Sequence, residues 1–209
     1  MSRLRQRDLR GGPNVGRVAI VTDSASDMDP ARASALGISI VPLAVSFGDQ
    51  TFRANLDLTA DAFWARMTAP EAPFPKTATT SPGDFAAAYK AAFEAGAEAI
   101  VSIHVATTLS GTMKAAALAK GMLPDREIHL VDSTSASMGE GLLCEMAAGL
   151  AGQGVAAAEI ARVVEGRTKD LNLYVALDTL EYLKRGGRIS GTSAAIGPRC
   201  RRPRRDGRS

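Results

Sequence analysis

The sequence predicts an α/β fold, with a mostly parallel, doubly wound N-terminal domain followed by a truncated second α/β domain. Two observations predict it. Short apolar runs rich in Ile and Val, typical of buried strands, alternate with segments of helical periodicity. Hydroxyl-rich turns follow three of the runs, at 22–24, 107–112 and 132–134. Ligands of such sheets bind at the carboxyl ends of the strands, so we expect these turns to lie together at one edge.

Capping residues delimit the helices expected in the first half of the chain. Asp29 followed by Pro30 predicts a helix start, and Gly37 predicts its end. Pro42 indicates a bend in an extended stretch. The expected elements are a strand at 17–22, a short helix before Gly37, an extended stretch at 38–47, a ribbon strand at 51–53, a helix at 59–67, and a helix that Ser81 caps and Gly96 ends.

A strand, a small polar turn and a helix at 100–120 form the centre of the second half. The turn is Leu109-Ser110-Gly111-Thr112, and an Ala-rich helix follows it. This arrangement presents backbone N–H groups to an anion, and Ser110 and Thr112 add hydroxyl groups. The remaining expected elements are a strand at 127–131, helices at 137–151 and 156–168, a strand at 171–177, and a short helix at 179–184.

Composition limits the compartment and the partners. The chain carries a net charge of +3, but the two Arg-rich ends are basic and the part between them is acidic. Neither end interleaves aromatic residues with its arginines, so we expect no nucleic-acid partner. No apolar run is long enough to span a membrane or to serve as a secretory signal, which predicts no stable membrane insertion. Cys144 and Cys200 lie far apart and suit a reducing compartment, so we expect a cytoplasmic protein.

These patterns divide the chain into four expected parts. A basic leader at 1–16 precedes an N-terminal α/β domain at 17–165. Residues 166–197 begin an incomplete C-terminal α/β domain, and 198–209 form an Arg-rich tail. Both ends are expected to be disordered, because they lack apolar periodicity.

The sequence lacks the side-chain clusters that most catalysis requires. His104 and His129 lie within apolar strands, where a histidine is more often structural than a general base. No Cys and His cluster has metal-ligand spacing, and no Gly-rich loop carries a phosphate-binding Lys, so we expect no cofactor. Asp23 and Asp132 follow strands and are expected to organise loops rather than to touch an anionic ligand.

Six motifs, taken together, resemble the DegV family of bacterial fatty-acid-binding proteins, some of which present the fatty acid to a separate kinase subunit. The resemblance extends from about Arg17 to Gly197. The motifs are Val21-Thr22-Asp23-Ser24-Ala25-Ser26-Asp27, Val41-Pro42-Leu43, Phe47-Gly48-Asp49, Leu109-Ser110-Gly111-Thr112, Val131-Asp132-Ser133, and Leu180-Glu181-Tyr182-Leu183-Lys184-Arg185-Gly186-Gly187-Arg188-Ile189-Ser190-Gly191.

The resemblance implies a site for the carboxylate of a long-chain fatty acid, with Ser110 as one hydroxyl ligand and Gly111 and Thr112 supporting the turn. The second hydroxyl falls on Thr77. Here the sequence departs from the family, because Ala78 stands where Ser is usual and Thr80 where Pro is usual. Thr79 or Thr80 are therefore alternatives.

The resemblance also suggests a partner, a fatty acid kinase subunit. Arg185 and Arg188 are expected either to face the chemistry of that partner or to be solvated.

Two other hypotheses remain at this stage. One is an enzyme that acts on a small carboxylated or phosphorylated substrate, with Asp23 or Asp132 as base. The other is a non-functional truncated fragment. Family members continue past the Gly-Gly-Arg-Ile-Ser-Gly motif, so the Arg-rich tail is interpreted either as a frameshifted or truncated end or as an interaction arm.

Overall fold

The structure, a computed structural model, describes residues 17–189. The chain divides into two compact units, Met1–Leu173 and Tyr174–Ser209. The expected leader at 1–16, the end of the incomplete domain at 190–197 and the tail at 198–209 lie outside the described residues.

Four parallel strands form the main sheet of the first unit, in the order β2-β1-β6-β7. Their bounds are Val18–Asp23 for β1, Ile38–Val41 for β2, Ala99–His104 for β6 and Glu127–Asp132 for β7. The chain builds outward from β1 to β2 and then from β6 to β7. The boundary between β1 and β6 is therefore the topological switch point, where open α/β sheets form their ligand crevice.

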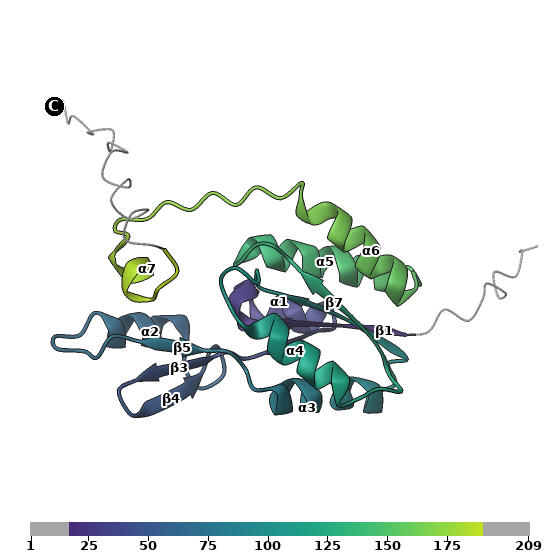
Figure 1. Ribbon diagram of the computed structural model, residues 1–209, viewed down its shortest axis with the longest axis horizontal. Coiled ribbons are helices and arrows are strands. Elements are labelled where there is room, and N and C mark those ends of the chain that lie inside the picture. Colours follow the sequence, from purple (N-terminus) through teal and green to yellow (C-terminus); the bar gives the residue numbers. More distant parts are fainter. Residues whose placement is uncertain (1–16, 190–209) are drawn as a thin grey trace, which may run out of the picture. The chain divides into compact units, whose positions relative to one another are not determined.

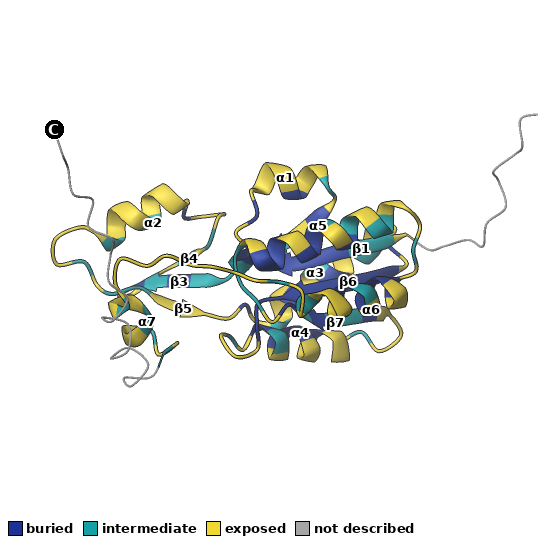
Figure 2. Cartoon of the chain, turned by 90° about the horizontal axis from the view of Figure 1, so that it is seen from above, coloured by how far each residue is buried: buried dark blue, intermediate teal, exposed yellow. Residues whose placement is uncertain are grey.

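Helices cover both faces of this sheet, as the sequence predicts (Figure 1). The helices α1 (Pro30–Ala35), α5 (Met138–Gly152) and α6 (Ala157–Thr168) pack on one face. The helices α3 (Pro82–Glu94) and α4 (Thr112–Gly121) pack on the other. All six residues of β6 are buried, and β1 and β6 are largely dark blue in Figure 2. A parallel strand covered on both faces is expected to be largely apolar, and β6 departs from this at Ser102 and His104.

A second, antiparallel sheet has the order β4-β3-β5. It consists of β3 (Ala44–Phe47), β4 (Gln50–Arg53) and β5 (Lys76–Ala78), and the helix α2 (Ala60–Met67) packs against it. Val45, Phe47 and Leu58 form its small core. The ribbon predicted at 51–53 is present, but the sequence analysis did not predict β5.

The predicted helix caps are confirmed. Asp29, Thr59 and Ser81 each accept a hydrogen bond from the backbone N–H three residues later, at 2.8, 3.3 and 3.1 Å. Gly37 and Gly96 follow their helices with φ of +67° and +94°, a backbone conformation that Gly adopts without strain.

The strand predicted at 171–177 is wrong for the described residues. Leu171 packs against the core, but Leu173, Tyr174, Val175 and Leu177 are exposed. A strand requires a hydrogen-bonded neighbour, and no strand among residues 17–189 pairs with this segment. The predicted short helix is present as α7 (Glu181–Arg185), in the second unit.

Candidate ligand-binding site

The hydroxyl-rich turns lie together at the carboxyl edge of the main sheet, as predicted. The N–H of Val105, after β6, donates to Asp23 Oδ2, at the end of β1, over 3.2 Å. The hydroxyl of Thr107 donates to Asp132 Oδ2, at the end of β7, over 2.7 Å. These side-chain bonds connect β1 and β6 across the switch point, and they connect β6 to β7.

Asp23 and Asp132 organise loops, as predicted. Asp23 is fully buried, and its carboxylate accepts hydrogen bonds from the N–H groups of Ala25 and Val105. Asp132 accepts from the backbone and side chain of Thr107 and from the N–H of Thr134. Both carboxylates therefore hold the loops at the ends of their strands through hydrogen bonds.

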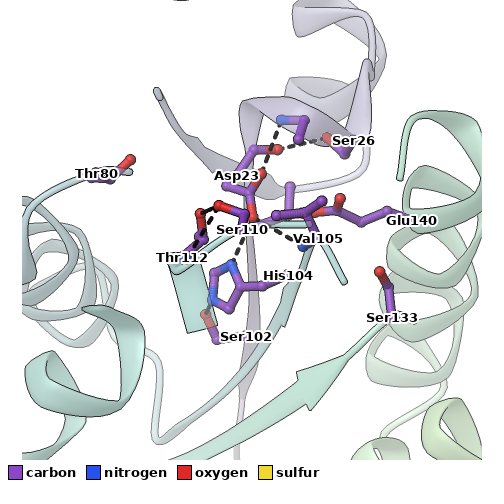
Figure 3. A network of polar contacts seen from close by, with 12 residues as sticks. Asp23, Ser26, Thr80, Ser102, His104, Val105, Ser110, Thr112, Ser133 and Glu140 are labelled. Carbon is purple, nitrogen blue, oxygen red and sulfur yellow. Dashed lines mark hydrogen bonds and ion pairs between the residues drawn. The ribbon is translucent and has the colours of Figure 1, made fainter. Parts of the chain in front are cut away.

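A buried chain of polar side chains extends from Asp23 into the core (Figure 3). His104 lies between Asp23 Oδ2, 3.1 Å from its Nδ1, and Ser102 Oγ, 2.8 Å from its Nε2. This is the connectivity of a Ser-His-Asp catalytic triad. However, all three side chains are fully buried, and Ser102 Oγ also contacts the hydroxyl of Tyr89 at 3.0 Å. A buried serine cannot meet a substrate, so His104 has the structural role that the sequence predicts.

Glu140 is a buried carboxyl group that sequence reasoning missed. It lies in the first turn of α5 and approaches the end of β1 (Figure 3). Its Oε1 accepts from the hydroxyl of Thr22 over 2.8 Å, whereas Oε2 has no partner among the described residues. Burial, with the nearby charge of Asp23, raises the pKa of Glu140 to about 9. The side chain is therefore a neutral carboxylic acid at neutral pH.

The turn of Ser110, Gly111 and Thr112 lies between β6 and α4. Ser110 is half-buried and Thr112 is fully buried. Ser110 Oγ lies 2.8 Å from Thr112 Oγ1 and accepts the N–H of Thr112 over 3.3 Å. Gly111 is the N-cap of α4 and provides no side-chain cap. The turn thus combines a partly exposed hydroxyl group with the positive end of a helix.

The three candidate threonines for the second hydroxyl have different environments. Thr77 is exposed on β5, opposite Val45 of β3. Thr79 is also exposed, and a Cβ placed on Gly111 would lie 3.5 Å from its methyl carbon, so Thr79 is beside the Ser110 turn. Thr80 is buried and donates its hydroxyl to the carbonyl of Pro42 over 2.7 Å. Thr80 therefore has no proton left for a carboxylate.

A cleft of about 390 Å³ lies beside Thr79 and Thr80 and is lined by residues that include members of β2, α3 and the small sheet. Most of its lining side chains are apolar, and Arg53 and Asp84 contribute charge. The lining residues are Ile40, Val41, Pro42, Ala44, Arg53, Leu56, Thr79, Thr80, Ser81, Asp84 and Ala88.

Arg185 and Arg188 belong to the second unit. Arg185 forms an ion pair with Glu181, one helical turn earlier, at 3.5 Å. The guanidinium of Arg188 donates to the carbonyl of Gly186 over 2.6 Å. Both contacts are local to α7 and the turn that follows it.

Among residues 17–189, no three His, Cys, Asp or Glu side chains are grouped closely enough to hold a metal ion. No helix in the same range is both long and apolar enough to cross a membrane.

Fold and site together define a doubly wound α/β protein with a hydroxyl-bearing turn at its switch point. The chain belongs to the DegV family. The family model, described as uncharacterised protein of the DegV family, matches residues 17–199.

Relatives and solved structures agree with this assignment. A DegV domain-containing protein of Deinococcus radiodurans is 37% identical over 180 residues, covering 86% of this chain and 63% of that protein. A fatty-acid-binding DegV family protein of Thermus thermophilus superposes with a TM-score of 0.77 at 34% identity, covering 87% of this chain and 64% of that one. DegV of Bacillus subtilis, described as a fatty acid binding protein, gives a TM-score of 0.78 at 29% identity with the same coverage. The chain thus spans slightly less than two thirds of the length of these proteins.

Proposed function

We propose that this protein binds a long-chain fatty acid through its carboxylate, for lipid transport or fatty acid metabolism. The hydroxyl of Ser110 carries the proposal. It is partly exposed at the switch point and lies beside the N-terminus of α4. A hydroxyl donor and the positive end of a helix both stabilise an anion.

Related proteins support the choice of ligand. Those of Thermus thermophilus and Bacillus subtilis are described as binding fatty acid, and a protein of Eubacterium ventriosum as binding stearic acid. The last has a TM-score of 0.74 at 28% identity. All three are longer than this chain, so the ligand is inferred here from the shared fold and the local chemistry of the turn.

Binding rather than catalysis agrees best with the geometry. Asp23 and Asp132 hold loops, and the Ser102, His104 and Asp23 chain is fully buried. The enzyme hypothesis requires an accessible base or nucleophile in the crevice. Asp23 is fully buried, and the half-buried Asp132 is held by three hydrogen-bond donors.

The second hydroxyl ligand in this proposal is Thr77, with Thr79 as the alternative. Thr79 is adjacent to the Ser110 turn. Thr77 precedes it by two residues, the spacing that places side chains on the same side of an extended chain. Separate Thr77→Val and Thr79→Val variants distinguish them, because only the residue that donates to the carboxylate should lose affinity when its hydroxyl is removed.

A fatty acid kinase subunit is the partner that we propose. Arg185 and Arg188 are candidates for the surface that meets the kinase, since each keeps a guanidinium outside the core at α7 or the following turn. A carrier of this kind supplies no phosphoryl-transfer machinery itself. Acyl phosphate formed from this protein, fatty acid and ATP alone would contradict the carrier role.

The central test is the affinity of Ser110→Ala for palmitate. Removal of a hydrogen bond to a charged group costs about 1.5–3 kcal/mol, so we expect affinity to fall by roughly 10- to 150-fold. Titration calorimetry at matched folded fraction measures the change. The matched control is Thr59→Ala, because Thr59 caps α2 and does not line the cleft. It should lose about 1 kcal/mol of stability and retain its affinity. Equal losses of affinity in the two variants would remove Ser110 from the site.

A further inference from the structure

The hydroxyl group of Thr112 has an unusual position beside the proposed ligand site. Its side chain is fully buried, and its Oγ1 lies 2.8 Å from Ser110 Oγ. Within residues 17–189, Ser110 is its only hydrogen-bond partner. Thr112 cannot reach solvent, so its proton has one acceptor available.

This arrangement fixes the direction of the hydrogen bond between the two hydroxyls. If Ser110 donated to Thr112, the Thr112 proton would be buried without an acceptor, which is costly. If Thr112 donates to Ser110, both groups are satisfied, because the half-buried Ser110 can direct its own proton outward. The second arrangement is therefore favoured.

The backbone N–H of Thr112 also supports this direction of the hydrogen bond. The N–H of Thr112 also donates to Ser110 Oγ, over 3.3 Å. Ser110 Oγ then accepts two hydrogen bonds from Thr112, which occupy both of its lone pairs, and it has one proton left to donate. Successive hydrogen bonds polarise one another, so the outward Ser110 proton becomes a better donor to an anion.

We propose that Thr112 is a positioning residue that sets Ser110 as an obligate donor and so makes the site selective for an ionised carboxylate. The inference rests on the proposed function. A carboxylate only accepts hydrogen bonds and matches this arrangement. The hydroxyl head group of a fatty alcohol also carries a proton, and Ser110 offers that proton no free lone pair.

The test compares the affinities of palmitate and hexadecanol for the wild type, Thr112→Val and Thr112→Ser. Valine has nearly the shape of threonine and keeps the backbone N–H, but it cannot donate. We expect Thr112→Val to lower the affinity for palmitate by about 2- to 10-fold, the range for one neutral hydrogen bond. The affinity for hexadecanol should fall less or should rise, because a lone pair of Ser110 becomes free. Thr112→Ser restores the donor and should retain the wild-type ratio of the two affinities.

The ratio distinguishes a positioning role from a packing role. A purely structural contribution of Thr112 would change both affinities equally, and that result would overturn the inference. If Thr112→Val does not fold, Thr112→Ala provides the same comparison. A folded Thr112→Val protein could keep the wild-type affinity for palmitate while Ser110→Ala loses affinity. That result would refute the role of Thr112 and leave the proposed function standing. Failure of the wild type to bind palmitate at all would instead refute the proposed function.

Discussion

At the scale of single residues, two neighbouring buried carboxyl groups differ in how many donors they meet. Asp23 accepts hydrogen bonds from two backbone N–H groups and contacts His104. Glu140 receives one hydrogen bond, from Thr22, and Oε2 has no partner among the described residues. A buried carboxyl with so few donors is more stable when protonated.

Glu140 makes the free energy of unfolding depend on pH. Its pKa is about 9 in the folded protein against an ordinary value of 4.5. Between these values the folded state holds a proton that the unfolded state has released, so this contribution to the free energy of unfolding decreases as pH rises. Glu140→Gln removes the titrating group. We expect the free energy of unfolding of Glu140→Gln, measured with urea and compared with that of wild type, to increase from pH 5 to pH 9.

The matched control for this prediction is Glu145→Gln, on the same helix. Glu145 is paired with Arg32 near the surface, and this pair lowers the pKa of Glu145. Removal of an exposed pair changes stability by about 0–1 kcal/mol. A wild-type pH slope that persists in Glu140→Gln would show that the buried carboxyl is not the source.

Sequence reasoning at this scale succeeded where a residue type has one common role. A histidine inside an apolar strand is usually structural, and His104 is structural. Glu140 was missed because a glutamate in a helix usually faces solvent. Its position in line with Leu143, Cys144 and Ala147, all buried on the same face of α5, was the available signal.

At the scale of elements, local signals placed the helices well and the small sheet less well. Asp29, Thr59 and Ser81 act through their own backbone neighbours, so sequence alone identifies them. The three-residue strand β5 is exposed along its length and depends on pairing with the distant β3. Its sequence contains no apolar alternation that would reveal such pairing.

A second prediction concerns the segment between β5 and α3. Thr80 links this segment to the carbonyl of Pro42, in the bend between β2 and β3. Thr80→Val keeps the shape of the side chain and removes this hydrogen bond. We expect a loss of about 1 kcal/mol in the free energy of unfolding, since Pro42 is only half-buried.

The same variant tests the alternative in which Thr80 binds the ligand. Because its proton is donated to Pro42, palmitate affinity measured at matched folded fraction should equal that of wild type. A loss comparable with that of Ser110→Ala would assign the second carboxylate donor to Thr80 instead of Thr77.

At the scale of the whole molecule, the alternation of strands and helices predicts the fold class, but it does not predict the strand order. The order β2-β1-β6-β7 depends on contacts between distant segments, such as Val105 with Asp23. That order places the Ser110 turn, which follows β6, beside the switch point. The hydroxyl-rich strand ends predict a shared edge, and the strand order shows that β1 and β6 form its centre.

Enclosure of the acyl chain contributes to how tightly a fatty-acid-binding protein holds its ligand. Each enclosed methylene contributes about 0.8 kcal/mol, so the affinity for an acyl chain depends on how much of it is covered. The solved relatives, of which this chain covers about 64%, contain further residues. Ser110 and Thr77 both lie among the described residues, so the carboxylate contact can be tested directly by substitution.

The contact between Ser110 and the carboxylate is most directly tested with palmitate labelled with ¹³C at its carboxyl carbon. Titration into the wild-type protein should give a bound carboxyl resonance shifted from that of free palmitate, with the carboxyl pKa of the bound ligand lowered by the hydroxyl donor. The Thr59→Ala protein should give the same resonance. The Ser110→Ala protein should show a different shift and a higher ligand pKa. A bound resonance and pKa that are identical in wild type and Ser110→Ala would contradict the account.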